Sequence, residues 1–169
     1  MKALGAVFAI LTMAFALVAC GEGGGAKFPQ KAGEMPAGQV WEGVYYNPVY
    51  GYLHMLDQGN SIVGRWKRTD GSHWGELSGT AEGNLVRFTW KEHGIGVIGP
   101  SGDTHGTGVF VFKLPKDSDI AELDGQYAVD DSDSIGQWHC VKQNNVKPDI
   151  NSINGDNPDA PVAPKDSWQ

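Results

Sequence analysis

The sequence predicts an all-β protein, a single antiparallel up-and-down meander of about eight strands that forms a closed or nearly closed barrel. Short segments rich in Val, Ile, Tyr, Trp and Phe recur from Val40 onward, each bounded by Gly, Asn, Asp or Pro. Residues that tolerate positive φ join them at 58–60, 70–72 and 82–84. No stretch repeats apolar residues every 3.6 positions over three turns, so we expect almost no helix.

The eight expected strands follow one another with short connections, except between the fifth and the sixth. Local connections of this kind favour a meander in which each strand pairs with the next. The expected strands are Val40–Asn47, Gly51–Gln58, Ser61–Arg68, Trp74–Ala81, Asn84–Glu92, Thr107–Leu114, Leu123–Asp130 and Ser134–Lys142.

Alternation along the strands predicts which face is buried. In the fifth expected strand, Val86, Phe88 and Trp90 share one face and polar residues share the other. In the sixth, Phe110 and Phe112 share a face, but the valines between them make the opposite face apolar as well. The second expected strand is apolar on both faces, and its alternation assigns neither of them to the core.

Eight strands with one aromatic face can close on themselves, which removes the exposed edges of an open sheet. A barrel of this size has an interior that is either packed solid or holds one small ligand. Glycine stands two residues before an aromatic residue at several points, for example in Gly64-Arg65-Trp66 and Gly136-Gln137-Trp138. We expect such glycines to let a neighbouring ring lie over bare backbone.

The N-terminus predicts export. Lys2 precedes an uncharged, mostly apolar run at Ala3–Ala19, which is the pattern of a secretory signal peptide. Leu17-Val18-Ala19-Cys20 resembles the lipobox of bacterial lipoproteins. That resemblance implies cleavage before Cys20 and attachment of diacylglycerol to its thiol, with several acyl chains giving stable anchoring. The alternative is an ordinary signal peptide whose cleavage site happens to precede a cysteine.

These features divide the chain into four parts. We expect a signal peptide at 1–19, a lipidated Cys20 with a flexible Gly-rich tether at 20–38, the barrel at 39–143 and a disordered polar tail at 144–169. The protein would then be exported and lipid-anchored. In a diderm cell, Gly21 in place of an Asp after the cysteine resembles the pattern of outer-membrane sorting.

Three stretches together resemble the small secreted β-barrels of the calycin type, the group of lipocalins and avidins. They are Trp41-Glu-Gly-Val-Tyr, the segment 56–66 with Gln-Gly-Asn-Ser-Ile-Val-Gly-Arg-Trp, and the segment 75–86 with Gly-Glu-Leu-Ser-Gly. The resemblance covers about 50 residues and implies a fold rather than a function. The chain lacks the Gly-x-Trp opening of lipocalins and a recognisable avidin ligand set, so no binding residues carry over.

The charge balance argues against nucleic acid as a partner. Lys2 is the one charged residue of 1–19, so the remaining chain carries 12 basic and 20 acidic residues. Phosphate binding needs clustered Lys and Arg instead. Cys20 is assigned to lipid, which leaves Cys140 as a lone thiol that cannot form an intramolecular disulfide. We expect it to be a small buried residue on a strand.

No catalytic set and no metal site stand out, and we expect neither a cofactor nor an enzyme. The five histidines lack the spacing of metal ligands. A hydrolase acting through His54, His93 or His105 remains a third and weaker hypothesis. The glycine-rich segment 93–106 is expected to be a flexible loop at one mouth of the barrel, either functional or a spacer.

The remaining candidate for function is a set of aromatic residues on the inward faces. The set forms either the core or the wall of a pocket for a small apolar ligand. We therefore predict a membrane-anchored, non-enzymatic binding module, with a structural or assembly protein that contacts other envelope proteins as the alternative. The candidate ligand-binding residues are Trp66, Phe88, Trp90, Phe110, Phe112, Tyr127 and Trp138.

Overall fold

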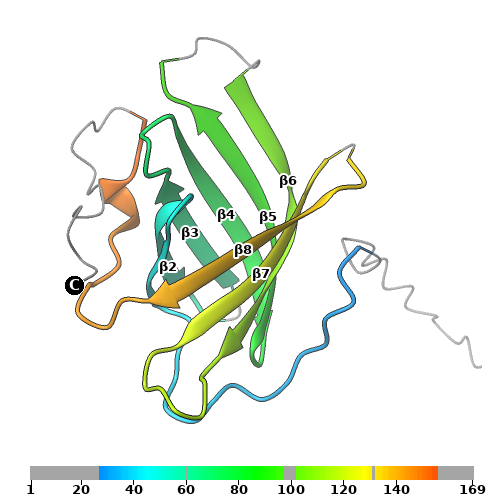
Figure 1. Ribbon diagram of the computed structural model, residues 1–169, viewed down its shortest axis with the longest axis vertical. Coiled ribbons are helices and arrows are strands. Elements are labelled where there is room, and N and C mark those ends of the chain that lie inside the picture. The colour runs from blue at the N-terminus through cyan, green and yellow to red at the C-terminus, as the bar shows by residue number, and fades with distance from the viewer. Residues whose placement is uncertain (1–26, 60, 97–101, 131, 156–169) are drawn as a thin grey trace, which may run out of the picture.

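The structure, a computed structural model, describes residues 27–59, 61–96, 102–130 and 132–155. Eight antiparallel strands follow one another in order, and the last pairs with the first to close a barrel (Figure 1). The predicted fold class is therefore confirmed. The strands are β1 (Gly43–Asn47), β2 (Gly51–Asp57), β3 (Ser61–Lys67), β4 (His73–Glu82), β5 (Leu85–Gly94), β6 (Asp103–Lys113), β7 (Glu122–Val129) and β8 (Ile135–Lys142).

The two ends of the barrel differ. We call the end that carries the β1–β2, β3–β4, β5–β6 and β7–β8 connections the open end. The opposite, closed end is covered by Trp41, whose indole Nε1 donates to the Gly83 carbonyl at 3.1 Å. Its ring meets that of Phe112 edge-on with a centroid distance of 5.4 Å, and the Tyr45 hydroxyl donates to the Trp41 carbonyl at 2.8 Å. This end is closed by well-packed aromatic side chains.

Inside the barrel, rings on one strand lie over glycines on the next. Trp66 faces Gly75, where a Cβ would stand 2.2 Å from the indole. Phe88 lies in the same way over Gly108, at 2.5 Å from such a Cβ. These glycines provide the room that lets large aromatic residues fill an eight-stranded barrel. The same arrangement places Phe110 over Gly125 and Tyr127 over Gly136.

The second strand, whose buried face alternation left open, turns Leu53 and Met55 inward, with exposed fractions of 1% and 0%. His54 lies between them and points outward, yet it is also buried. Both faces of this strand are therefore covered, which explains why both are apolar.

Residues 27–38 differ from the predicted flexible tether, because they lie along the outer wall. We call them the strap. Phe28 is 1% exposed and packs against Leu85, Val109 and Ala128. The Arg87 guanidinium donates to the Gln30 carbonyl at 2.7 Å. The apolar outer face of β6 explains the strap, since that face needs a cover and Phe28 supplies it.

The strap runs from the open end to the closed end. The Lys27 ammonium donates to the carbonyl of Ser132 in the β7–β8 connection at 3.0 Å. Further along, Gly33 and Asn84 exchange backbone and side-chain hydrogen bonds of 3.0 and 2.7 Å beside the β4–β5 turn. Figure 1 shows this segment in blue, passing outside the barrel to the connection that enters β1.

The chain after β8 also differs from the predicted disordered tail, as far as residue 155. It crosses the outer wall of β2 and β3 and forms a short 3-10 helix, η2 (Ile150–Ser152), drawn in orange in Figure 1. Ile153 is 2% exposed, and the Asp149 backbone N–H donates to His54 Nδ1 at 2.9 Å. One apolar side chain and one buried histidine thus fix a segment whose composition is otherwise polar. The rest of that prediction, 156–169, lies outside the described residues.

The predicted loop 93–106 is shorter than expected. β5 continues to Gly94 and β6 begins at Asp103, with His93 opposite Asp103 in the ladder. The Lys91 ammonium pairs with the Asp103 carboxylate at 2.8 Å on the outer face. Polar cross-strand pairs extend a hairpin without an apolar pattern, so alternation did not indicate them.

In the part of the chain that the structure describes, no helix is both long and apolar enough to span a bilayer.

Candidate ligand-binding site

A cavity of about 120 Å³ lies inside the barrel at the open end. Three tryptophans form much of its wall, together with two tyrosines, an arginine, a glutamate, a threonine and a valine. Trp90 is 8% exposed, whereas Thr104 at the rim is exposed. The lining residues are Tyr50, Trp66, Arg68, Trp90, Glu92, Thr104, Tyr127, Val129 and Trp138.

Four of the seven candidate residues line this cavity: Trp66, Trp90, Tyr127 and Trp138. The other three lie deeper and form core instead. Phe88 stacks on Phe110 with centroids 4.7 Å apart, and Phe112 packs against Trp41 at the closed end. The interior is thus partly the packed core and partly the pocket wall that the sequence left as alternatives.

The polar centre of the cavity is the carboxylate of Glu92, a side chain only 7% exposed. It accepts hydrogen bonds from Arg68 Nε at 2.9 Å, from Arg68 Nη2 at 2.6 Å and from the indole Nε1 of Trp66 at 3.1 Å. The hydrogen bonds that Arg68 donates to Glu92 raise the pKa of Arg68, which stays charged. The pair presents almost no net charge to the cavity, and its donors and acceptor hold the wall in place.

Two tyrosine hydroxyls also line the cavity, and the Arg68 guanidinium lies over the Tyr50 ring at 5.5 Å from its centroid. Tyr50 and Tyr127 are 2.7 Å apart between their hydroxyl oxygens, and the Tyr50 ring also lies 4.9 Å from that of Trp138. Burial raises the pKa of Tyr50, and the hydrogen bond with Tyr127 raises it further. The Tyr50 hydroxyl is therefore protonated at neutral pH, and a polar atom of a ligand would find a donor and several lone pairs at these two hydroxyls.

Five lining residues were absent from the candidate set: Tyr50, Arg68, Glu92, Thr104 and Val129. One of them has a signal in the sequence. The inward alternation of Val86, Phe88 and Trp90 continues to position 92, so it places a carboxylate inside the barrel. Burying a charge is expensive unless a partner neutralises it, so an inward Glu92 should have indicated a nearby Arg or Lys.

The indole N–H of Trp138 is buried and makes no hydrogen bond to the described part of the chain. Burial raises the pKa of the Cys140 thiol, and the Trp138 side chain opposes that rise. Cys140 itself is 0% exposed on β8, as the sequence predicted.

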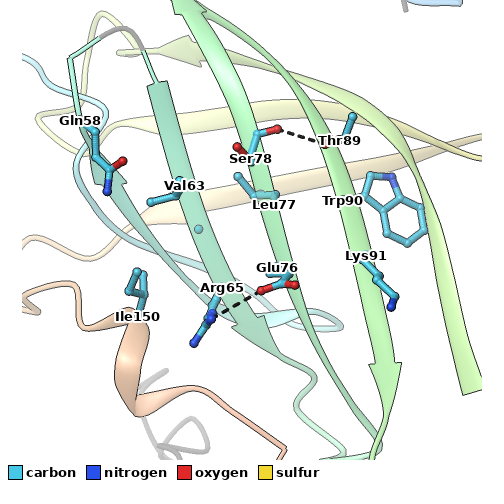
Figure 2. A pocket seen from close by; sticks show the side chains of 11 residues that line it. Gln58, Val63, Arg65, Glu76, Leu77, Ser78, Thr89, Trp90, Lys91 and Ile150 are labelled. Atoms are coloured by element: carbon cyan, nitrogen blue, oxygen red, sulfur yellow. Dashed lines mark hydrogen bonds and ion pairs between the residues drawn. The ribbon is translucent and has the colours of Figure 1, made fainter. Parts of the chain in front are cut away.

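A second, shallower depression of about 470 Å³ lies on the outer wall of β3, β4 and β5 (Figure 2). Arg65 and Glu76 form an ion pair of 3.5 Å across its floor, and both side chains are partly exposed. Ile150 of η2 flanks it, while Trp90 extends to the other side of the sheet, into the barrel. The depression is therefore an open, mixed polar surface, unlike the aromatic cavity.

The three histidines of the hydrolase hypothesis do not converge at the open end. His54 lies under the C-terminal segment on β2, and His105 is an exposed residue of β6 that approaches Asp130 at 3.5 Å. His93 stacks on Trp74 and contacts the Asp103 carboxylate at 3.1 Å. Across residues 27–155, with the masked positions left aside, no group of three or more His, Cys, Asp and Glu side chains is arranged to hold a metal ion.

The closed eight-stranded barrel is compatible with the calycin-type resemblance. Searches of protein-family models, curated proteins and solved structures found no match to this chain. The expected lipid attachment residue Cys20 lies outside the described residues.

Proposed function

We propose that this chain is an exported lipoprotein, anchored through Cys20, whose barrel is a non-enzymatic binding module for a small ring-bearing ligand. The observation that supports the binding role is the cavity at the open end, with three tryptophans around one neutralised ion pair. Binding sites are concave and mostly apolar, with a few placed polar groups that orient the ligand. The anchoring role rests on the sequence around Cys20.

The size of the cavity limits the ligand. Its volume of about 120 Å³ approaches the roughly 150 Å³ of an apolar protein cavity that holds one benzene ring. The ligand is therefore a single ring or a part of similar size, with little or no charge. One hydroxyl or carbonyl group would match the tyrosine hydroxyls, and the flat faces would stack on the indoles.

The arrangement of Glu92 favours binding over catalysis. Its carboxylate has three donors, two of them from one guanidinium, so three of its roughly four lone pairs are already engaged. A general base needs a free lone pair within reach of the substrate proton. We assign the pair a structural and orienting role in the site.

Native mass spectrometry of the lipid-free protein, residues 21–169, tests the binding role. We expect a co-purifying small molecule, or binding of phenol as a probe, and loss of both in Val129→Phe, which fills the cavity. Val146→Phe is the matched control, because Val146 is 45% exposed on the outside. A clean apo mass that phenol does not change would overturn the proposal.

The anchor is tested separately by the mass of the N-terminal peptide from the membrane fraction. We expect cleavage before Cys20 and the added mass of acyl chains, both abolished in Cys20→Ser. An unmodified Cys20 in a protein released from the membrane would exclude the anchoring role and leave the binding role standing.

A second candidate function is contact with an envelope protein, and the depression on the outer wall favours it. Ser78 and Thr89 at its centre are exposed. A photoreactive residue at position 78 should then give a crosslinked product on intact cells that the same group at Asp124, on another side of the barrel, does not give. Equal products from both positions would argue against this surface.

A further inference from the structure

The strap determines where the N-terminal part of the chain leaves the barrel. Lys27, the first described residue, donates to Ser132 in the β7–β8 connection, which belongs to the open end. The next residue, Phe28, is buried against Ala128 at the end of β7. The buried Phe28 side chain and the Lys27 hydrogen bond thus fix the exit point. It lies at the same end of the barrel as the aromatic cavity.

The strap holds this position over its length. The Arg87 guanidinium donates to the carbonyls of Phe28 and Gln30, at 3.4 and 2.7 Å. The amide of Gln30 donates to the Gln126 side chain at 2.6 Å on β7. Contacts to two different strands define the direction of the strap as well as its place. The segment that leads to Cys20 therefore starts at the open end.

Only a short stretch separates this exit from the proposed lipid. From Cys20 to Lys27 the chain can span at most about 25 Å, even when it is fully extended. β6, the longest strand, has 11 residues, and a strand of that length in a tilted barrel covers roughly 25 Å along the axis. The closed end consequently lies about one barrel length farther than the open end from the point where the chain leaves toward the anchor.

We propose that the open end is the face of the barrel that lies toward the membrane, so that the cavity opens toward the lipid headgroups. This inference rests on the proposed lipid anchor at Cys20. A ring-bearing molecule that partitions into the bilayer would then meet the cavity directly. The ligand class becomes membrane-soluble, amphipathic ring compounds rather than solutes of the surrounding water.

The exposed charges of the open end give little attraction to anionic lipid, so in this proposal the strap sets the orientation. Asp70, Asp103, Asp130 and Asp133 are exposed there. Anionic headgroups attract clustered basic residues, and among the described residues of this end only Lys27 is an exposed Lys or Arg. The barrel should accordingly keep its orientation on vesicles without anionic lipid.

Energy transfer to the membrane tests the orientation on the acylated protein. A donor dye is attached at Asp133→Cys on the open end or at Asp117→Cys on the closed end, both of them exposed positions. Cys140 is buried and does not compete for the dye. The vesicles are neutral phosphatidylcholine with an acceptor-labelled lipid. We expect transfer from position 133 to exceed transfer from position 117 by about twofold, since roughly one barrel length separates them.

Releasing the strap provides the matched control. Phe28→Ala should lower the ratio of the two transfer efficiencies toward one, while Pro29→Ala, at an exposed neighbour, should leave it unchanged. Equal transfer from both positions, or stronger transfer from position 117, in protein shown by mass to be acylated would overturn the orientation and leave the anchor intact. A protein that carries no lipid and does not bind the vesicles would overturn both, and phenol binding by the barrel is measured independently of either.

Discussion

The guanidinium of Arg68 and the carboxylate of Glu92 form a two-point pair, with Nε to Oε1 at 2.9 Å and Nη2 to Oε2 at 2.6 Å. Arg68 follows β3 and Glu92 lies on β5, so the pair crosses the intervening strand β4. Gly75 on β4 makes this contact possible, because it leaves space for the Trp66 ring that also donates to Glu92. One glycine, one indole and one ion pair thus fix the open end of three adjacent strands.

Breaking this pair should destabilise the barrel and reduce binding. Arg68→Met leaves the buried Glu92 without its charge partner, and we expect a loss of about 2 kcal/mol, reduced from a fully buried pair because Arg68 is 31% exposed. Glu92→Gln alone should also destabilise. The double variant should lose less than the sum of the two, in urea unfolding at neutral pH. Strict additivity would contradict the coupling.

A methyl group at Gly75 should be poorly tolerated. The Cβ of Gly75→Ala would stand 2.2 Å from the Trp66 ring, and we expect a loss of about 3 kcal/mol in the free energy of unfolding. Combining it with Trp66→Leu should recover part of the loss relative to additivity, because the ring no longer occupies the space. Ser78→Ala, exposed on the same strand, serves as the control and should change stability by less than about 0.5 kcal/mol.

The strap should contribute to stability through one side chain. Phe28→Ala removes a fully buried ring from the contact with Leu85 and Val109, and we expect a loss of about 3 kcal/mol. Proteolysis within 27–38 should become faster at the same time, as the strap detaches. Pro29→Ala should change neither measurement. Unchanged protease resistance in Phe28→Ala would show that the strap is held elsewhere.

The C-terminal segment should be sensitive to acid. Burial lowers the pKa of His54 below its ordinary value of 6.5, against smaller opposing effects of the Asp149 backbone carbonyl, 3.1 Å from Nδ1, and of the Asp149 charge. The folded state thus binds fewer protons than the unfolded chain, so stability is full above pH 6.5 and falls as the pH drops from there toward the lower folded pKa. Arg65, opposite His54 in the ladder, adds a like charge on the same face.

Urea unfolding in mildly acidic and in mildly alkaline buffer measures this effect. We expect the difference in stability between the two buffers to shrink in His54→Leu, which cannot titrate. Asp149→Asn, which keeps the backbone N–H donor, is the matched control and should retain most of the difference. An equal pH response in wild type and His54→Leu would assign the acid sensitivity to other groups.

The barrel could be predicted because the residues that specify each strand and turn lie close together in the sequence. Alternation with period two and turn residues between strands specify a meander, and inward glycines opposite rings specify closure. Trp90, for example, needs only its neighbours Phe88 and Glu92 to be placed inside. The polar extension of β5 and β6 was missed because cross-strand pairs such as His93 and Asp103 carry no apolar signal.

The two covering segments could not be predicted in the same way, because each depends on a contact distant in sequence. Phe28 is buried by Val109, and Asp149 is held by His54, which is 95 positions away in the sequence. Residues 27–38 and 143–155 are mostly polar or small and contain Gly and Pro, so composition favoured disorder. A hint remained in the apolar outer faces of β2 and β6, since such faces need a cover.

The central claim is that the cavity at the open end binds a ring, and the indole N–H signals of the tryptophans test it most directly. In a titration of the isotope-labelled protein with phenol, followed by nuclear magnetic resonance, the signals of Trp66, Trp90 and Trp138 should shift in a saturable way. The signals of Trp41 at the closed end and of Trp74 on the outer wall should not shift. No saturable shift, or shifts of equal size at Trp41 and Trp74, would contradict the account.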